Sequence, residues 1–140
     1  MHFKNSIQSN GLFGPESDYF LNNVKLKNVT TNSKSLFHFT NKNAKFNYVY
    51  FDHVNNVGDI NESSLIQFES INKDNFIILD HVYFNNCMTN GNSIYFNGYN
   101  NEIKNTIISD NISYGPTISI LSPEVIKLWI WKYFLFQLIY

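Results

Sequence analysis

Two aspartate–histidine pairs are the residues of this chain that are best suited to chemistry. They are Asp52-His53 and Asp80-His81, and each pair follows an apolar residue and precedes a valine. If the two segments are stacked copies of one repeat, Asp52 lies next to Asp80. Two carboxylates that close would share a cation, or the pKa of one of them would rise. The pair is therefore a candidate ligand site.

The same positions also fit a purely structural role, in which a polar side chain stands at one bend of every repeat and satisfies backbone groups. The members of this predicted polar ladder are Asn28, His53, His81 and Asn105. The charged residues that precede them run plus, minus, minus, plus along the column and partly compensate one another. They are Lys27, Asp52, Asp80 and Lys104. We favour the ladder over the carboxylate pair.

Tyrosines next to these pairs add a possible binding function. Tyr50 and Tyr83, like Tyr48 and Tyr95, could stack on sugar rings, and an Asn-rich surface supplies amides that recognise hydroxyl groups. The alternative is that tyrosine is simply a good strand residue that stacks on its equivalent in the next repeat. The candidate ligand-binding residues are Asp52, Asp80, Tyr50 and Tyr83.

These residues are placed by an internal repeat of 24 to 29 residues. One series of segments reads apolar, charged, Asn or His, then β-branched: Leu26-Lys27-Asn28-Val29, Phe51-Asp52-His53-Val54, Leu79-Asp80-His81-Val82 and Ile103-Lys104-Asn105-Thr106. A second series keeps step with it: Ser35-Leu36-Phe37, Ser64-Leu65-Ile66, Ser93-Ile94-Tyr95 and Thr117-Ile118-Ser119. Short β-rich repeats with several turns each are typical of a parallel β-helix of about four coils.

Residues Val82–Phe96, VYFNNCMTNGNSIYF, resemble the repeat of right-handed parallel β-helix proteins of the pectate-lyase-like and polymorphic outer-membrane type. The resemblance extends loosely over residues 21–121 and implies an all-β, right-handed solenoid. It also implies an extracellular or cell-surface location and the roles found in such families, which include adhesins and carbohydrate-active enzymes. Fold alone does not choose among those roles.

Composition excludes several classes of partner. The formal net charge is -1 and the chain contains no arginine, so we expect no nucleic acid partner. The lone Cys87 rules out an internal disulfide and a cysteine zinc site. We predict no metal and no cofactor.

Catalysis is not favoured by the residues present. The lyases that the chain resembles use a basic residue, usually arginine or lysine, beside a calcium-binding carboxylate cluster, and the hydrolases use a close group of aspartates. This chain has no arginine and no adjacent Asp-Asp pair. Only Asp52 and Asp80 could approach the carboxylate spacing that glycoside hydrolysis needs. We therefore expect a non-catalytic scaffold that binds polysaccharide or a cell-surface protein, with a fragment of a carbohydrate-active enzyme as the alternative.

The two ends of the sequence differ in character from the repeats. Residues 1–20 are expected to be irregular or capping and contain no apolar stretch typical of a secretory signal. Residues 122–140 form a hydrophobic tail, and Ser122-Pro123 is a good helix start. The tail fits a capping helix, a membrane-associating segment through 125–140, or an artefact of a truncated gene. In the last case the chain is a fragment. Open solenoid ends would also permit self-association.

Three N-glycosylation sequons are present, which would matter only on secretion. They lie at Asn28, Asn61 and Asn111.

Overall fold

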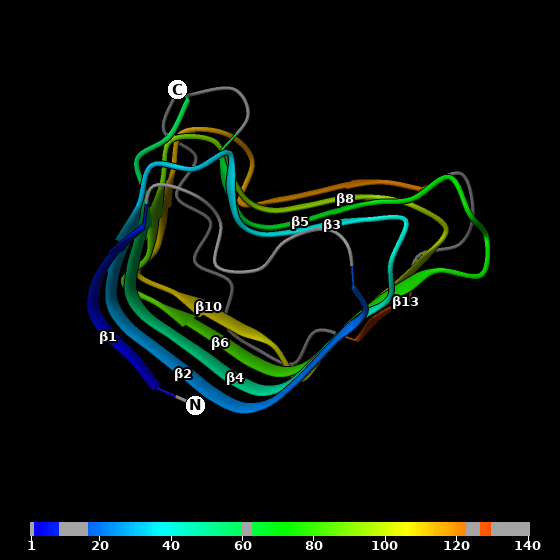
Figure 1. The fold of residues 1–140 in the computed structure, drawn as a ribbon, viewed down its shortest axis with the longest axis horizontal. Coiled ribbons are helices and arrows are strands. Elements are labelled where there is room, and N and C mark those ends of the chain that lie inside the picture. Colours follow the sequence, from blue (N-terminus) through cyan, green and yellow to red (C-terminus); the bar gives the residue numbers. More distant parts are fainter. Residues whose placement is uncertain (1, 9–16, 60–62, 123–126, 130–140) are drawn as a thin grey trace.

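The computed structural model of the chain describes residues 2–8, 17–59, 63–122 and 127–129. Within these ranges it is all-β and contains no helix, and its strands form a parallel solenoid of about four turns (Figure 1). The predicted parallel β-helix is confirmed. The strands are β1 (His2–Gln8), β2 (Tyr19–Thr31), β3 (Ser35–Thr40), β4 (Ala44–Asn56), β5 (Ser64–Glu69), β6 (Phe76–Asn85), β7 (Met88–Thr89), β8 (Asn92–Asn97), β9 (Asn100–Lys104), β10 (Ile107–Ser109), β11 (Ile112–Ser113), β12 (Ile118–Leu121) and β13 (Lys127–Trp129).

Two parallel sheets make up the walls of the solenoid. The larger has the order β1-β2-β4-β6-β9-β13, with β10 paired to β6, and β7 paired to β4 and β11. The smaller has the order β12-β8-β5-β3 and faces β2, β4 and β6 across the cross-section (Figure 1). Four successive coils each contribute one strand to the smaller sheet, so equivalent residues of these coils stand side by side along the solenoid axis.

The long strands of the larger sheet turn two corners without leaving the sheet, because single residues adopt a left-handed backbone conformation. At the first bend these residues have φ of about 50°: Asn23, Tyr48, His81 and Asn105. The second bend has the same geometry at Asn28, His53, Asn86 and Asp110. Asn and Asp tolerate this conformation better than other residues with a Cβ, which explains the many Asn-containing segments between apolar positions.

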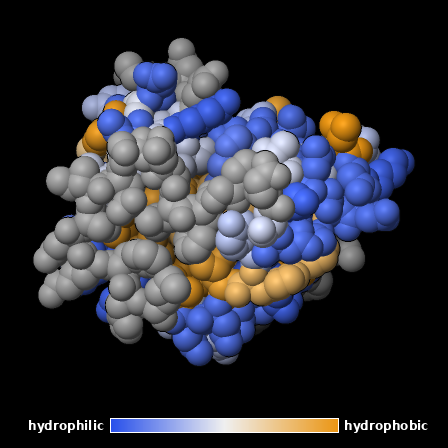
Figure 2. Space-filling view, in the orientation of Figure 1, coloured by the Kyte–Doolittle hydropathy of each residue, from blue (hydrophilic) through white to orange (hydrophobic). Residues whose placement is uncertain are grey.

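Aromatic and aliphatic side chains fill the interior in columns. The fully buried side chains include Phe37, Phe46, Phe51, Phe68 and Phe96. Phe51 stacks on Phe84 of the next coil with ring centroids 4.6 Å apart. Apolar and polar residues alternate along the straight parts of the strands, which places one set inside and the other on the outer surface. Figure 2 shows that the surface of the described residues is mostly hydrophilic, with hydrophobic residues toward the middle of the view.

A column of polar residues interrupts this apolar interior at the corner that follows β2, β4, β7 and β11. Its members are Thr31, Asn56, Thr89 and Ser113. Each side chain hydrogen-bonds the residue two positions further on, for example Thr89 Oγ1 to the Gly91 carbonyl at 2.9 Å. Asn56 accepts from the Gly58 amide at 3.0 Å and donates to the Ser64 carbonyl at 2.8 Å. The column therefore stabilises the turn of every coil from inside.

The coils differ in length although their strands pair in step. Equivalent residues of the larger sheet are 25 positions apart from β2 to β4, 33 apart from β4 to β6, and 24 apart from β6 to β10. The longer coil takes up its extra residues at the corners before and after β5.

Both terminal segments contribute strands where the structure describes them. Within 1–20, His2–Gln8 is β1 and pairs with β2, so this part of the expected irregular or capping segment is regular strand. Within 122–140, Lys127–Trp129 is β13 and pairs with β9. These three residues are therefore strand and not helix. The rest of the expected C-terminal helix lies outside the described residues.

Candidate functional site

The register places the two candidate aspartates apart from each other. Asp80 stands opposite Asn47 at the first bend, and Asp52 stands opposite Asn85 at the second. The predicted stacking of Asp52 on Asp80 was therefore wrong. Most bends read apolar, polar, left-handed residue, apolar, and each coil has two bends. The last coil departs from this pattern, with Thr106 after Asn105 and Asn111 after Asp110. The predicted alignment had matched the second bend of one coil with the first bend of the next.

The predicted polar ladder divides into two for the same reason. Asn28 lines up with His53 at the second bend, and His81 lines up with Asn105 at the first. Each of the four residues has a left-handed backbone, so each stands at a bend as expected. The side chains of His53, His81 and Asn105, however, face aspartate side chains and not backbone groups. The single column of four was wrong.

Asp52 is held as a carboxylate by three neighbours. Its Oδ2 lies 2.9 Å from Lys27 Nζ, while Oδ1 faces His53 Nδ1 at 2.8 Å and accepts from Asn85 Nδ2 at 3.1 Å. The hydrogen bonds from Lys27 and His53 lower its pKa from 3.8 to about 2. A carboxylate in that state cannot donate a proton near neutral pH.

Asp80 has a similar environment one bend away. His81 Nδ1 lies 2.8 Å from Oδ1, although without the alignment of a hydrogen bond, and Asn105 Nδ2 donates to the same oxygen at 3.0 Å. Lys104 Nζ is 3.6 Å from Oδ2. Partial burial acts to raise the pKa of Asp80, but the Asn105 hydrogen bond and the Lys104 charge outweigh it and lower the pKa.

Tyr50 and Tyr83 occupy the surface between the two bends, so the four predicted ligand-binding residues do share one face. Their rings are parallel within 6° and their centroids are 4.7 Å apart. Each ring therefore covers one face of the other, as the structural alternative expected. Because the aspartates and one face of each ring already have partners, this tyrosine face offers a ligand less than an unstacked ring would.

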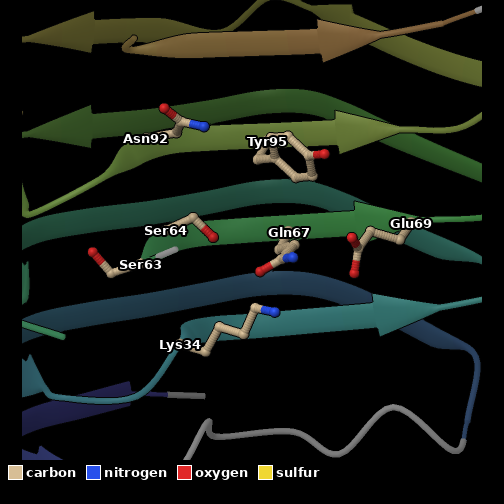
Figure 3. A pocket seen from close by; sticks show the side chains of 7 residues that line it. All are labelled: Lys34, Ser63, Ser64, Gln67, Glu69, Asn92 and Tyr95. Atoms are coloured by element: carbon tan, nitrogen blue, oxygen red, sulfur yellow. The ribbon is translucent and has the colours of Figure 1, made fainter. Parts of the chain in front are cut away.

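A hollow of about 230 Å³ on the smaller sheet is a better candidate. Three successive coils contribute to it, and its side chains gather on one side of the sheet (Figure 3). The lining residues are Lys34, Ser63, Ser64, Gln67, Glu69, Asn92 and Tyr95. Six of the seven side chains are polar and the seventh is a tyrosine.

Internal hydrogen bonds fix the lower wall of the hollow. Ser35 donates to Gln67 Oε1 across one coil, and Ser64 donates to Ser35 at 3.1 Å. Glu69 Oε2 faces His38 Nε2 at 2.9 Å. These contacts hold Gln67 and Glu69 in defined orientations, as a preorganised binding wall requires.

The upper wall carries groups without a protein partner. Within the described residues the Tyr95 hydroxyl and the Asn92 carboxamide make no hydrogen bond, and Tyr95 contacts no other aromatic ring. Its neighbours in adjacent coils are Gln67 and Ser119, neither of which stacks on it as Tyr83 does on Tyr50. Ser63 lines the hollow, and its buried Oγ also has no partner in this part of the chain.

Sequence reasoning found only part of this hollow. Tyr95 was among the candidate aromatics, whereas Lys34, Gln67 and Glu69 were not singled out. The second repeat series matched Ser64 with Ser93, but Ser64 stands opposite Asn92. The alternation of apolar and polar residues over Ile66-Gln67-Phe68-Glu69 is a signal that could have placed Gln67 and Glu69 on the outer side of the sheet.

Two of the three sequons lie within the described residues. Asn28 is exposed at the second bend. Asn111 is partly buried, and its Oδ1 accepts from the Cys87 amide at 2.7 Å. Asn61 lies outside the described residues. Glycosylation stays a prediction that depends on secretion.

Cys87 is a core residue, and burial raises the pKa of its thiol to about 12. No group of three or more His, Cys, Asp or Glu residues in the described ranges could hold a metal ion. In the same ranges no helix is long and apolar enough to cross a membrane.

The fold therefore defines a parallel β-solenoid with a polar hollow on its smaller sheet. No protein-family model, no curated protein and no solved structure matches the chain.

Proposed function

We propose that this chain is a non-catalytic β-helix scaffold that binds carbohydrate in the hollow. The observation that carries the proposal is the unused hydrogen-bonding capacity beside an unstacked tyrosine. Tyr95 offers a hydroxyl and a ring face, and Asn92 offers a carboxamide. Sugars present hydroxyl groups in a ring around apolar C–H faces, so this combination is complementary to them.

The size and openness of the site favour a short stretch of a longer ligand. Small-molecule pockets usually enclose about 300 to 1,000 Å³ and are mostly apolar. The hollow is smaller, at about 230 Å³, and mostly polar. We infer that one or two sugar units of a polysaccharide lie against Tyr95 while the rest of the polymer stays in solvent.

The resemblance of Val82–Phe96 to β-helix repeats of the pectate-lyase-like and polymorphic outer-membrane type supports an extracellular or cell-surface role. It also makes a cell-surface protein a second kind of partner and a carbohydrate-active enzyme fragment the competing function. The contacts of Asp52 speak against its use as a catalytic acid. Membrane attachment through 125–140 stays a prediction, and most of these residues lie outside those that the structure describes.

The test is a binding assay of the full chain on immobilised neutral and acidic polysaccharides. We expect at least one polysaccharide to bind, and Tyr95→Ala to weaken its Kd about tenfold, which corresponds to about 1.4 kcal/mol. Asn92→Ala should weaken it as well. Tyr83→Ala is the matched control, because it removes a tyrosine from the other sheet.

The same samples are assayed for new reducing ends and unsaturated products, with and without calcium. Binding without turnover supports the proposal. Turnover that Asp80→Ala abolishes would establish the enzyme instead. Equal losses of affinity in Tyr95→Ala and Tyr83→Ala would mean that the ligand does not bind in the hollow.

A further inference from the structure

An Asn-Gly step next to Glu69 of the hollow has surroundings that suit a spontaneous chemical modification. Asn97 ends β8 and is exposed, and Gly98 follows it. Within the described residues the Asn97 side chain and the Gly98 amide make no hydrogen bond. No hydrogen bond within these residues therefore holds either reacting group in place.

The glycine of this step is required by packing. A Cβ on Gly98 would lie 2.6 Å from Cε1 of the Phe68 ring, inside the core. A side chain at this position would also hinder the approach of the Gly98 amide nitrogen to Cγ of Asn97. Packing therefore requires glycine after Asn97, and glycine is the residue that hinders cyclisation least.

We propose that Asn97 is a deamidation site that adds a carboxylate beside Glu69 of the hollow. The Gly98 nitrogen attacks Cγ of Asn97, the bond from Cγ to Nδ2 breaks, and ammonia leaves with the amide proton. Water then opens the resulting succinimide at either carbonyl to give aspartate or isoaspartate. No oxidant, metal or further reactant is needed.

The new charge would lie next to a residue of the hollow. Asn97 stands opposite Glu69 in the register of β5 and β8, and both side chains point outward. Opposite positions in neighbouring strands bring like charges within repulsive range. The reaction would thus place two carboxylates side by side where Glu69 now contacts His38. This consequence for ligand binding rests on the proposed function, whereas the reaction itself does not.

The chain contains its own control in a second Asn-Gly step. Asn90 is followed by Gly91, but Asn90 Nδ2 donates to the Gly58 carbonyl of the preceding coil at 2.9 Å. This hydrogen bond holds the carboxamide that must rotate and leave. A third step, Asn10-Gly11, lies outside the described residues.

The experiment incubates the full-length chain at mildly alkaline pH and follows each Asn-Gly peptide by mass spectrometry. We expect the peptide with Asn97 to convert several times faster than the peptide with Asn90. In concentrated urea the two should convert at similar rates, because only the fold distinguishes them. Asn97→Gln, with a longer side chain that cyclises slowly, should remove the fast conversion.

Equal rates in the folded chain, or faster conversion at Asn90, would overturn the proposal. So would a folded chain that protects both steps while urea exposes both. The polysaccharide assay is then repeated with Asn97→Asp, and we expect weaker binding of an acidic polysaccharide than the parent chain shows. A mass-spectrometric result without any polysaccharide binding would leave the modification site standing and reject only the function proposed for the hollow.

Discussion

Among single residues, Asp52 connects its neighbours through its charge. Its carboxylate joins three coils, because Lys27 belongs to the coil before and Asn85 to the coil after. Its side chain is 19% exposed, so solvent weakens these contacts without removing them. The chain thus uses one charge to tie neighbouring strands at a bend, where backbone pairing is interrupted.

Asp52→Asn should lower the free energy of unfolding at pH 7 by about 1 kcal/mol after solvent screening is allowed for. The folded pKa of about 2 lies below the ordinary 3.8, so this stabilisation is present above pH 4 and is lost as the pH falls toward 2. Urea unfolding of both proteins across this range measures it. Asp74→Asn, at an exposed position, is the control and should change little. A difference that stays constant with pH would contradict the assignment.

At the scale of elements, the bends explain what the sequence could and could not predict. The all-β class and the interior columns follow from alternation and from Asn between apolar residues. The pairing of the bends does not, because both bends of a coil produce the same pattern of residue types. His53 and His81 look equivalent in sequence, yet they occupy different bends.

The hollow was hard to predict for a related physical reason. Its walls come from three coils, so its residues can be predicted to lie together only if the strand register is known to within one residue. A shift of one position exchanges inward and outward side chains. The extra residues of the longest coil lie at corners whose length no local sequence pattern predicts. The residues next to Tyr95 in the neighbouring coils could therefore not be predicted.

Two glycines, Gly58 and Gly115, lie at corners where the space for a Cβ differs. A Cβ on Gly58 would lie 2.5 Å from the Ser33 carbonyl oxygen, a backbone atom of the preceding coil that cannot turn away. We expect Gly58→Ala to cost about 1 to 3 kcal/mol in urea unfolding. At Gly115 the same distance is to Asn92 Oδ1, which can rotate, so Gly115→Ala should cost less. The reverse order would show that the close backbone approach at Gly58 is relaxed in solution.

At the scale of the whole molecule, the two ends of the solenoid are unequally covered. Leu36, Phe37 and Phe39 in the first strand of the smaller sheet are completely buried. Ile118 and Ile120 in its last strand point inward but stay partly exposed. Self-association at an end therefore remains a prediction, and the C-terminal end is where apolar surface would favour it.

Hydrogen exchange should follow the same gradient. Amides of β4 and β6, which have a paired strand on each side, should exchange slowest, and those of β11 and β12 fastest. Mass-resolved exchange of peptides from each coil measures this order. Uniform rates across all coils would mean that the solenoid opens as one cooperative unit. Slower exchange in β12 at higher protein concentration would be the sign of self-association.

The unequal coil lengths also suit the solenoid to carrying inserted segments at its corners. The corner between β5 and β6 holds extra residues, and Ile71 there is 87% exposed, yet the strands on either side keep their register. The coil therefore tolerates added length at this point without transmitting it to the walls. A foreign epitope grafted beside Ile71 would be displayed at a fixed height on a rigid post, and several such grafts on successive corners would form an ordered array.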